Sequence, residues 1–138
     1  MPGRRVTLPE VHVVAGVLED ADGRVLVNQR LPGTHMAGFW EFPGGKSAPG
    51  ETPLGALRRE LREELGIEVS CASPLIELVH DYREKRVRLD VWRVERWDGV
   101  PRGLERQPLR WVDVEELTEI GLLPADAPIV EALRSRRG

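Results

Sequence analysis

The chain has 138 residues, of which 31% are charged, and its net charge at neutral pH is −3. This length suits one domain with a proper core and is short for two, so we expect a single domain over residues 1–138. The slightly acidic balance argues against a nucleic-acid polymer as partner, because such a partner favours a basic surface. No stretch approaches the roughly 18 apolar residues of a membrane span, which argues against a membrane protein.

The N-terminus lacks the apolar core of a signal peptide. The single cysteine, Cys71, excludes an internal disulfide framework, and a reducing cytoplasm is therefore the simplest compartment. A lone cysteine near a strand is usually a small apolar filler, and we expect that role for Cys71.

The first part of the chain predicts short strands separated by turns. Residues 11–19 form an apolar, β-branched run that ends in the turn signal Asp-Ala-Asp-Gly at 20–23. Residues 24–29 predict a second strand that forms a hairpin with the first. A loop rich in Pro and Gly follows at 31–38, and residues 39–42 predict a short strand that leads into a Pro-Gly-Gly loop.

The next segment, residues 52–65, predicts a helix with well-marked ends. Thr52 is a hydroxyl N-cap, Pro53 follows where no intrahelical N–H is needed, and Gly66 is a natural stop. Leucines at helical spacing form an apolar face. They are Leu54, Leu57, Leu61 and Leu65.

The second half of the chain predicts more strands and a final helix. Residues 75–82 and 87–97 alternate well enough to be two neighbouring strands, with a turn at 97–99. Residues 109–112 predict a last short strand, and a helix follows from Pro124 onward. Strands mixed with two or three helices indicate the α/β (α+β) class, as a helix–sheet–helix sandwich with a mixed β-sheet.

Three carboxylates, Glu60, Glu63 and Glu64, share a second face of the helix over 52–65. Carboxylates at these spacings are neighbours on a helix surface and repel one another. A hard divalent cation such as Mg²⁺ prefers clustered oxygen ligands and brings substrate phosphates with it. The pattern therefore indicates a metal site, with a charged, solvated helix face as the ordinary alternative.

Residues 45–67 resemble the signature of the Nudix hydrolases, G-x5-E-x7-R-E-U-x-E-E-x-G-U, where U is a bulky apolar residue. Every constrained position is matched, including Gly45 and Glu51 ahead of the helix. The completeness of the match favours the metal site over a solvated face. The resemblance also implies the helix–sheet–helix fold.

Motifs outside the signature resemble the MutT branch of this family, the mutagenic-nucleotide pyrophosphohydrolases. They are NQR, HMAGFWEFPGGK, VERWDGVP, GLERQP and LLPADAP, in chain order. The resemblance implies a Mg²⁺-dependent enzyme, with Mn²⁺ able to substitute, that cleaves a small nucleoside triphosphate between the α and β phosphorus atoms. Nucleoside monophosphate and pyrophosphate are the products, and oxidised nucleotides such as 8-oxo-dGTP are the expected substrates. We expect a monomer or a weak homodimer.

Carried over to this chain, the resemblance implies a metal site built from the backbone carbonyl of Gly45 and four carboxylates. The carboxylates are Glu60, Glu63, Glu64 and Glu105. Arg59 counts among the catalytic residues because, in the family, it orients these carboxylates. Gly44 and Glu51 are expected to support the junction of loop and helix.

The general base stays open between Glu60 and Glu105. Carboxylates grouped around cations can leave one oxygen free to accept a proton from water. Taken alone, a Glu in the sequence GLERQP is ordinarily solvated, and its place in the MutT-like pattern is what makes Glu105 a candidate.

The resemblance also implies a set of substrate-binding residues. They are Arg30, His35, Glu41, Phe42, Tyr82 and Asp126. Enzymes specific for 8-oxoguanine typically carry Asn where this chain has Asp126. An amide donates and accepts, so it can pair with O6 and N1–H of an oxidised guanine, whereas an ionised Asp only accepts and a protonated Asp can pair with N3 and N4 of cytosine.

Two alternatives to the oxidised-purine enzyme remain. Relatives that hydrolyse CTP and modified dCTP also have a PAD sequence around Asp126, which makes a CTP or modified-dCTP pyrophosphohydrolase the nearer one. A non-catalytic Nudix module that senses a nucleotide is the alternative from another class. Such a module is expected to lose signature carboxylates, and this chain keeps all of them. An RNA-decapping role would need a basic groove, which the acidic balance does not favour.

Overall fold

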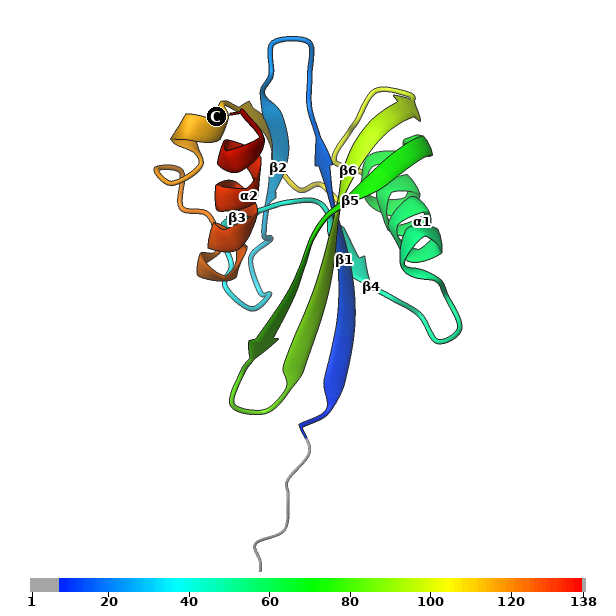
Figure 1. Ribbon diagram of the computed structural model, residues 1–138, viewed down its shortest axis with the longest axis vertical. Helices are drawn as coiled ribbons and strands as arrows, with labels where there is room; N and C mark the ends of the chain where they lie inside the picture. Colours follow the sequence, from blue (N-terminus) through cyan, green and yellow to red (C-terminus); the bar gives the residue numbers. More distant parts are fainter. Residues whose placement is uncertain (1–7, 138) are drawn as a thin grey trace, which may run out of the picture.

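Two small β-sheets occupy the middle of the molecule, with a helix on either side (Figure 1). The computed structural model describes residues 8–137. The strands are β1 (Glu10–Leu18), β2 (Val25–Gln29), β3 (Trp40–Glu41), β4 (Gly44–Lys46), β5 (Glu68–Asp81), β6 (Arg86–Asp98) and β7 (Leu109–Val112). The helices are α1 (Pro53–Leu65) and α2 (Ala127–Arg137), with short 3₁₀ turns η1 (Val114–Glu116) and η2 (Pro124–Asp126) before α2.

The larger sheet has the strand order β4-β1-β6-β5, and the smaller sheet has the order β3-β2-β7. β1 and β6 pair in parallel, whereas the other ladders are antiparallel. The prediction of a mixed sheet between helices is therefore confirmed. In Figure 1, β1, β5 and β6 continue past both helices as a protruding ribbon.

The prediction that the first two strands form a hairpin is wrong. The turn at 20–23 does form, because the Asp20 carboxylate accepts hydrogen bonds from two backbone N–H groups within it and at its end. Beyond a bridge between Glu19 and Val25, β1 and β2 diverge into different sheets. β1 pairs with β6 and β4, whereas β2 pairs with β3 and β7.

Several segments differ from their predicted bounds. β5 begins at Glu68 rather than Leu75, because bulges around Cys71 and Pro74 keep this irregular stretch paired with β6. The Pro-Gly-Gly segment, predicted as a loop, contributes strand β4, and β6 extends to Asp98 within the predicted turn. Cys71 is exposed, so the prediction of a small apolar filler is wrong.

Each helix covers its own apolar core. The core beside α1 includes Val14, Leu57, Leu61, Leu65, Ile67 and Val94. The core on the side of α2 includes Val17, Val27, Val91, Val112, Ile129 and Leu133. β1 serves both cores, with Val14 in the first and Ala15 and Val17 in the second. This is the period-two alternation of a strand that is covered on both faces.

The predicted ends of α1 are confirmed. Thr52 Oγ1 accepts a hydrogen bond from the N–H of Gly55 at 3.0 Å. Gly66 adopts a left-handed φ of 70°, and its N–H donates to the carbonyl of Arg62. The predicted apolar stripe is buried except for Leu54, which is partly exposed. Burial of this stripe sets the rotation of α1 about its axis.

β4 approaches β1 so closely that only glycine fits at its first position. A Cβ on Gly44 would lie 1.9 Å from the carbonyl oxygen of Val14, far inside van der Waals contact. In the antiparallel ladder, Gly44 pairs with Ala15 and Gly45 pairs with Val14. The two glycines therefore bring the backbone of β4 between β1 and α1, which packs against β4.

The contact at Gly44 leads to a stability prediction. Gly44→Ala should destabilise the fold by about 3 kcal/mol or more, because the added methyl group has to push two backbones apart. Gly50→Ala is the control: its φ of 82° disfavours a side chain, but no atom lies within 4 Å of the added Cβ. Its loss should stay near 1–2 kcal/mol. Urea unfolding monitored by circular dichroism measures both, and equal losses would contradict the steric argument.

Candidate active site

A cavity of about 180 Å³ lies where β2, β3, α1 and the loop before β7 meet. Its lining residues are Asn28, Gln29, Arg30, Leu31, Thr34, Glu41, Glu64, Glu105 and Gln107. Arg30, Glu41, Glu64 and Glu105 were singled out from the sequence, and each comes from a different element or loop. This cavity is therefore where the fold gathers predicted site residues.

Like charges are crowded at Glu64. The pKa of Glu64 is raised to about 8, first by burial and then by the neighbouring carboxylates of Glu60, Glu105 and Glu41. Burial also raises the pKa of Glu60, and this effect outweighs the opposing pull of the Arg59 guanidinium. A nearby cation favours the charged form of such carboxylates, so the crowding is a feature that a bound cation would relieve.

The backbone of β4 lies directly against the carboxylates of α1. The N–H of Gly44 donates to Glu64 Oε2 at 3.1 Å. A Cβ on Gly45 would lie 2.4 Å from Glu60 Oε2, so this carboxylate occupies the space that a side chain would need. The pair of glycines therefore lets backbone and carboxylates share one small volume.

Arg59 ties the loop before α1 to the carboxylates on the helix. Its guanidinium donates to the two oxygens of Glu51 at 2.7 and 2.8 Å. Arg59 Nη1 also donates to Glu60 at 2.9 Å and to Glu63 at 3.1 Å. The hydrogen bonds from Arg59 and from the N–H of Ala48 lower the pKa of Glu51 to about 2. Glu51 is thus ionised at neutral pH and anchors Arg59.

The oxygen atoms around Glu60 and Glu64 fit a hard divalent cation in kind, because carboxylate and backbone oxygens suit Mg²⁺ and Mn²⁺. Within residues 8–137, no three Asp, Glu, His or Cys side chains converge closely enough to hold an ion as they stand. Glu60 and Glu63 accept hydrogen bonds from Arg59, and Glu64 accepts one from a backbone N–H. Each of these bonds uses one oxygen of its carboxylate, so these side chains can move closer together around a cation and keep such a bond.

Arg30 and Glu41 form a second, polar part of the cavity wall. Arg30 Nη1 donates to the two oxygens of Glu41 at 3.0 and 3.3 Å. Burial raises the pKa of Glu41, and Arg30 opposes that rise.

Asp126 does not line the cavity but is buried close to this pair, with 6% of its surface exposed. Burial, followed by the charge of Glu41, raises the pKa of Asp126 to about 7, against the opposing effects of the Phe42 N–H and of Arg30. Ionised and protonated forms of Asp126 therefore coexist near neutral pH.

Three further residues expected to contact the nucleotide lie outside the cavity lining. Phe42 is 4% exposed and belongs to the core on the side of α2. Tyr82 lies in the turn between β5 and β6, 36% exposed, with its ring centroid 4.5 Å from that of His80. His35 is exposed, and its carbonyl, not its ring, accepts a hydrogen bond from Arg30. Phe42 thus packs in the core, Tyr82 lies in the β5–β6 turn beside His80, and the backbone of His35 contacts Arg30.

Sequence reasoning missed Asn28, Gln29 and Gln107, which also line the cavity. Asn28 and Gln107 are 6% and 7% exposed, although amide side chains usually lie at the surface. Both residues stand inside the motifs NQR and GLERQP. Their position in the motifs was the available signal, but burial was needed to distinguish them from solvated neighbours.

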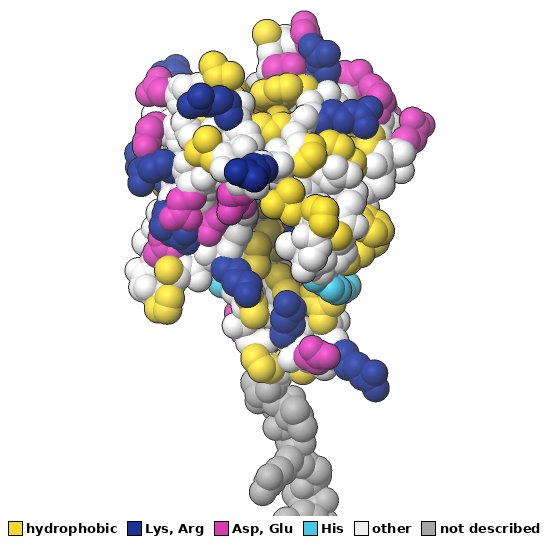
Figure 2. All heavy atoms as spheres, turned by 180° about the vertical axis from the view of Figure 1, so that it is seen from behind, with side chains coloured by type: hydrophobic (Ala, Val, Ile, Leu, Met, Phe, Trp, Pro, Cys, Tyr) yellow, Lys and Arg dark blue, Asp and Glu magenta, His cyan; other side chains and the backbone are white. Residues whose placement is uncertain are grey.

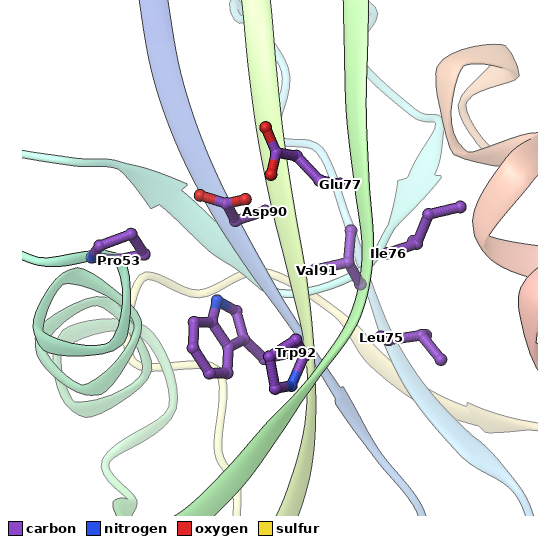
Figure 3. Close-up of a pocket in the computed structure, with 8 residues that line it drawn as sticks. Pro53, Leu75, Ile76, Glu77, Asp90, Val91 and Trp92 are labelled. Atoms are coloured by element: carbon purple, nitrogen blue, oxygen red, sulfur yellow. The ribbon is translucent and has the colours of Figure 1, made fainter.

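A larger hollow, of about 460 Å³, lies on the sheet near the start of α1 (Figure 3). Glu77 and Asp90 occupy paired positions on β5 and β6 and line this hollow together with Trp92. Asp90 pairs with His12, and Glu77 pairs with Arg88, so both carboxylates already have side-chain partners. None of the predicted site residues lines the hollow, and it is not the candidate active site.

The face of the molecule in Figure 2 carries acidic and basic side chains interspersed with apolar ones. No continuous basic stripe crosses that face, which therefore gives no support to a nucleic-acid polymer as partner. Within the described part of the chain, no helix is both long enough and apolar enough to cross a membrane.

Comparison with known proteins places the chain in a family. Residues 14–132 match the NUDIX domain family. The chain is 34% identical over 127 residues to the 8-oxo-dGTP diphosphatase of Escherichia coli strain K12, covering 92% of this chain and 98% of that protein. It is 39% identical over 127 residues to the CTP pyrophosphohydrolase of the same organism, covering 92% and 93%.

The fold is also similar to that of a solved relative. The solution structure of the Escherichia coli ORF135 protein matches with a TM-score of 0.85 and 37% identity, covering 95% of this chain and 93% of that one. Nudix hydrolases generally need a divalent metal, in keeping with the oxygen-rich surroundings of Glu64. Because the family match spans most of the sequence and contains the whole signature helix, the chain belongs to the Nudix family and is a Nudix hydrolase.

Proposed function

We propose that the chain is a Mg²⁺-dependent pyrophosphohydrolase of small nucleoside triphosphates, which removes oxidised nucleotides such as 8-oxo-dGTP. One observation carries the proposal: a single cavity joins the carboxylates of Glu64 and Glu105 to the polar pair of Arg30 and Glu41. The carboxylates of Glu64 and Glu105 suit a cation and phosphates, and the pair of Arg30 and Glu41 suits a nucleoside. An 8-oxo-dGTP diphosphatase and a CTP pyrophosphohydrolase among the relatives support this substrate class. We further propose a cytoplasmic monomer or weak homodimer.

In this proposal the backbone carbonyl of Gly45 and four carboxylates hold Mg²⁺, or Mn²⁺ in its place. The carboxylates are Glu60, Glu63, Glu64 and Glu105. A bound cation of this kind neutralises phosphate charge and favours attack by water. Arg59, anchored by Glu51, orients Glu60 and Glu63, and the N–H of Gly44 directs Glu64.

The proposed reaction adds water across the bridge between the α and β phosphorus atoms and yields a nucleoside monophosphate and pyrophosphate. One carboxylate accepts the proton that water releases. Glu60 and Glu105 are the candidates, because both lie close enough to Glu64 to raise its pKa.

Asp126, with Arg30 and Glu41, is proposed to select the base. The ionised form of Asp126 accepts two hydrogen bonds, so it suits N1–H and the exocyclic amine of a guanine-type purine. The protonated form also donates, so it suits N3 and the N4 amine of cytosine. The pKa of about 7 favours a CTP-type substrate as the second candidate, because both forms are populated. Phe42, Tyr82 and His35 stay in the proposed substrate-binding set, although they, like Asp126, lie outside the cavity lining.

Glu64→Gln should abolish most turnover while the fold remains intact. Loss of a ligand that helps neutralise transition-state charge should lower the rate by about 10²-fold or more. Pyrophosphate release at saturating Mg²⁺ measures the effect. Glu68→Gln is the control, because Glu68 is an exposed carboxylate paired with Arg62, and its turnover should match that of the wild type.

The same pair of variants tests metal binding without catalysis. Added Mg²⁺ should raise the melting temperature of the wild type and of Glu68→Gln, because a ligand that binds only the folded state stabilises it. This increase should be much smaller for Glu64→Gln. Near-normal turnover and an undiminished Mg²⁺ effect in Glu64→Gln would remove Glu64 from the site.

Base selection should depend on pH through Asp126. Because its pKa is about 7, lowering the pH from about 8 to about 6 protonates the carboxyl. The ratio of kcat/KM for CTP-type substrates to that for 8-oxo-dGTP should then rise by roughly tenfold or more. Taking the ratio of the two kcat/KM values cancels the pH effects that act equally on both substrates.

Asp126→Asn provides the matched variant, because an amide does not titrate in this range. It should flatten the pH dependence of the ratio. A ratio that responds to pH equally in wild type and variant would show that Asp126 does not read the base.

A further inference from the structure

The loop that carries Glu105 is attached to the C-terminal end of α1. The N–H of Arg102 donates to the carbonyl of Leu65 at 3.0 Å, and the N–H of Leu104 donates to the carbonyl of Glu64 at 3.0 Å. These carbonyls belong to the last turn of the helix, which has no intrahelical partner for them. The loop therefore caps the helix whose side chains face the cavity.

Gln107 adds two side-chain bonds to this attachment. Its Oε1 accepts the N–H of Glu105 at 2.9 Å, and its Nε2 donates to the carbonyl of Glu64 at 3.0 Å. One amide thus connects the backbones of Glu64 and Glu105, whose carboxylates both line the cavity. Gln107 is 7% exposed, so both bonds are shielded from water, and breaking them would leave a part-buried N–H and carbonyl with fewer partners.

The loop is held in a tight shape that needs such support. Arg106 adopts a left-handed φ of 66°, a conformation that is unfavourable for a residue other than glycine. A Cβ on Gly103 would lie 2.2 Å from the carbonyl oxygen of Gln107, so the two ends of the turn are in direct contact. The N–H of Arg106 donates to the carbonyl of Gly103 within this turn.

We propose that Gln107 is a positioning residue for the hydrolysis, which holds Glu105 beside Glu64 by linking the N–H of Glu105 to the carbonyl of Glu64. This inference rests on the proposed function, because it assumes that Glu105 takes part in the reaction. Gln107 does not itself act on the substrate. Its amide fixes the backbone from which the Glu105 side chain extends. A small displacement of a catalytic group can cost about 10²-fold in rate.

Gln107→Met tests this role, because methionine has a similar volume and supplies neither hydrogen bond. The variant should stay folded and lose about ten- to a hundredfold in kcat, with little change in KM. Leu104→Ala is the control in the same loop: its side chain is 50% exposed, and its backbone bond to Glu64 is retained. Its kcat should match that of the wild type.

A double-mutant cycle with Glu105→Gln separates positioning from general stability. If Gln107 acts through Glu105, Gln107→Met combined with Glu105→Gln should be no slower than Glu105→Gln alone. Binding of Mn²⁺, measured by calorimetry without nucleotide, should weaken in either single variant and weaken no further in the double variant.

Two results would overturn the inference while leaving the proposed function intact. One is wild-type kcat in Gln107→Met when Glu105→Gln is impaired, and the other is a double variant whose losses multiply. Wild-type activity and Mn²⁺ affinity in Glu105→Gln would instead remove Glu105 from the proposed site, and the positioning role of Gln107 with it.

Discussion

Repulsion among carboxylates around Glu64 is the constraint on which the rest of this structure depends. Burial and the nearby carboxylates of Glu60, Glu105 and Glu41 raise the pKa of Glu64 to about 8. Such an arrangement is unfavourable for an isolated fold, because buried like charges destabilise one another. Protonation of Glu64 relieves this repulsion, and a cation or an arginine in the same space relieves it while the carboxylates stay ionised. The fold still has to bring these side chains together.

Three structural features hold them. The buried leucine stripe sets the rotation of α1, so that its carboxylates meet β4. The glycines of β4 allow backbone contact with Glu60 and Glu64. Arg59 spans from Glu51 to the helix and supplies the one guanidinium that contacts Glu60 and Glu63 among the described residues. The carboxylates are thus positioned by apolar packing and backbone geometry, which do not depend on charge, and by the ion pairs of Arg59.

In the part of the cavity opposite Glu64 and Glu105, an ion pair balances the charges. Arg30 neutralises Glu41 there, and Asp126 is buried beside them with a pKa near neutrality. A titratable group in this position can present either of two hydrogen-bonding patterns, whereas an amide presents one. The proposed chemistry at one wall and the proposed recognition at the other therefore use different side chains that meet in one cavity. Glu41 couples the two walls, because its charge also raises the pKa of Glu64.

Local sequence determined the signature helix, its caps and the family, because Thr52, Pro53 and Gly66 act through their own backbone preferences and the carboxylates recur at helical spacing. The partners of β1, the bulged start of β5 and the strand at Gly44–Lys46 were decided by tertiary structure, since pairing depends on which edges are free. The same holds for the burial of Phe42 and the role of Gln107. Sequence spacing specifies neighbours along one element, whereas contacts between distant segments arise only when the whole chain packs.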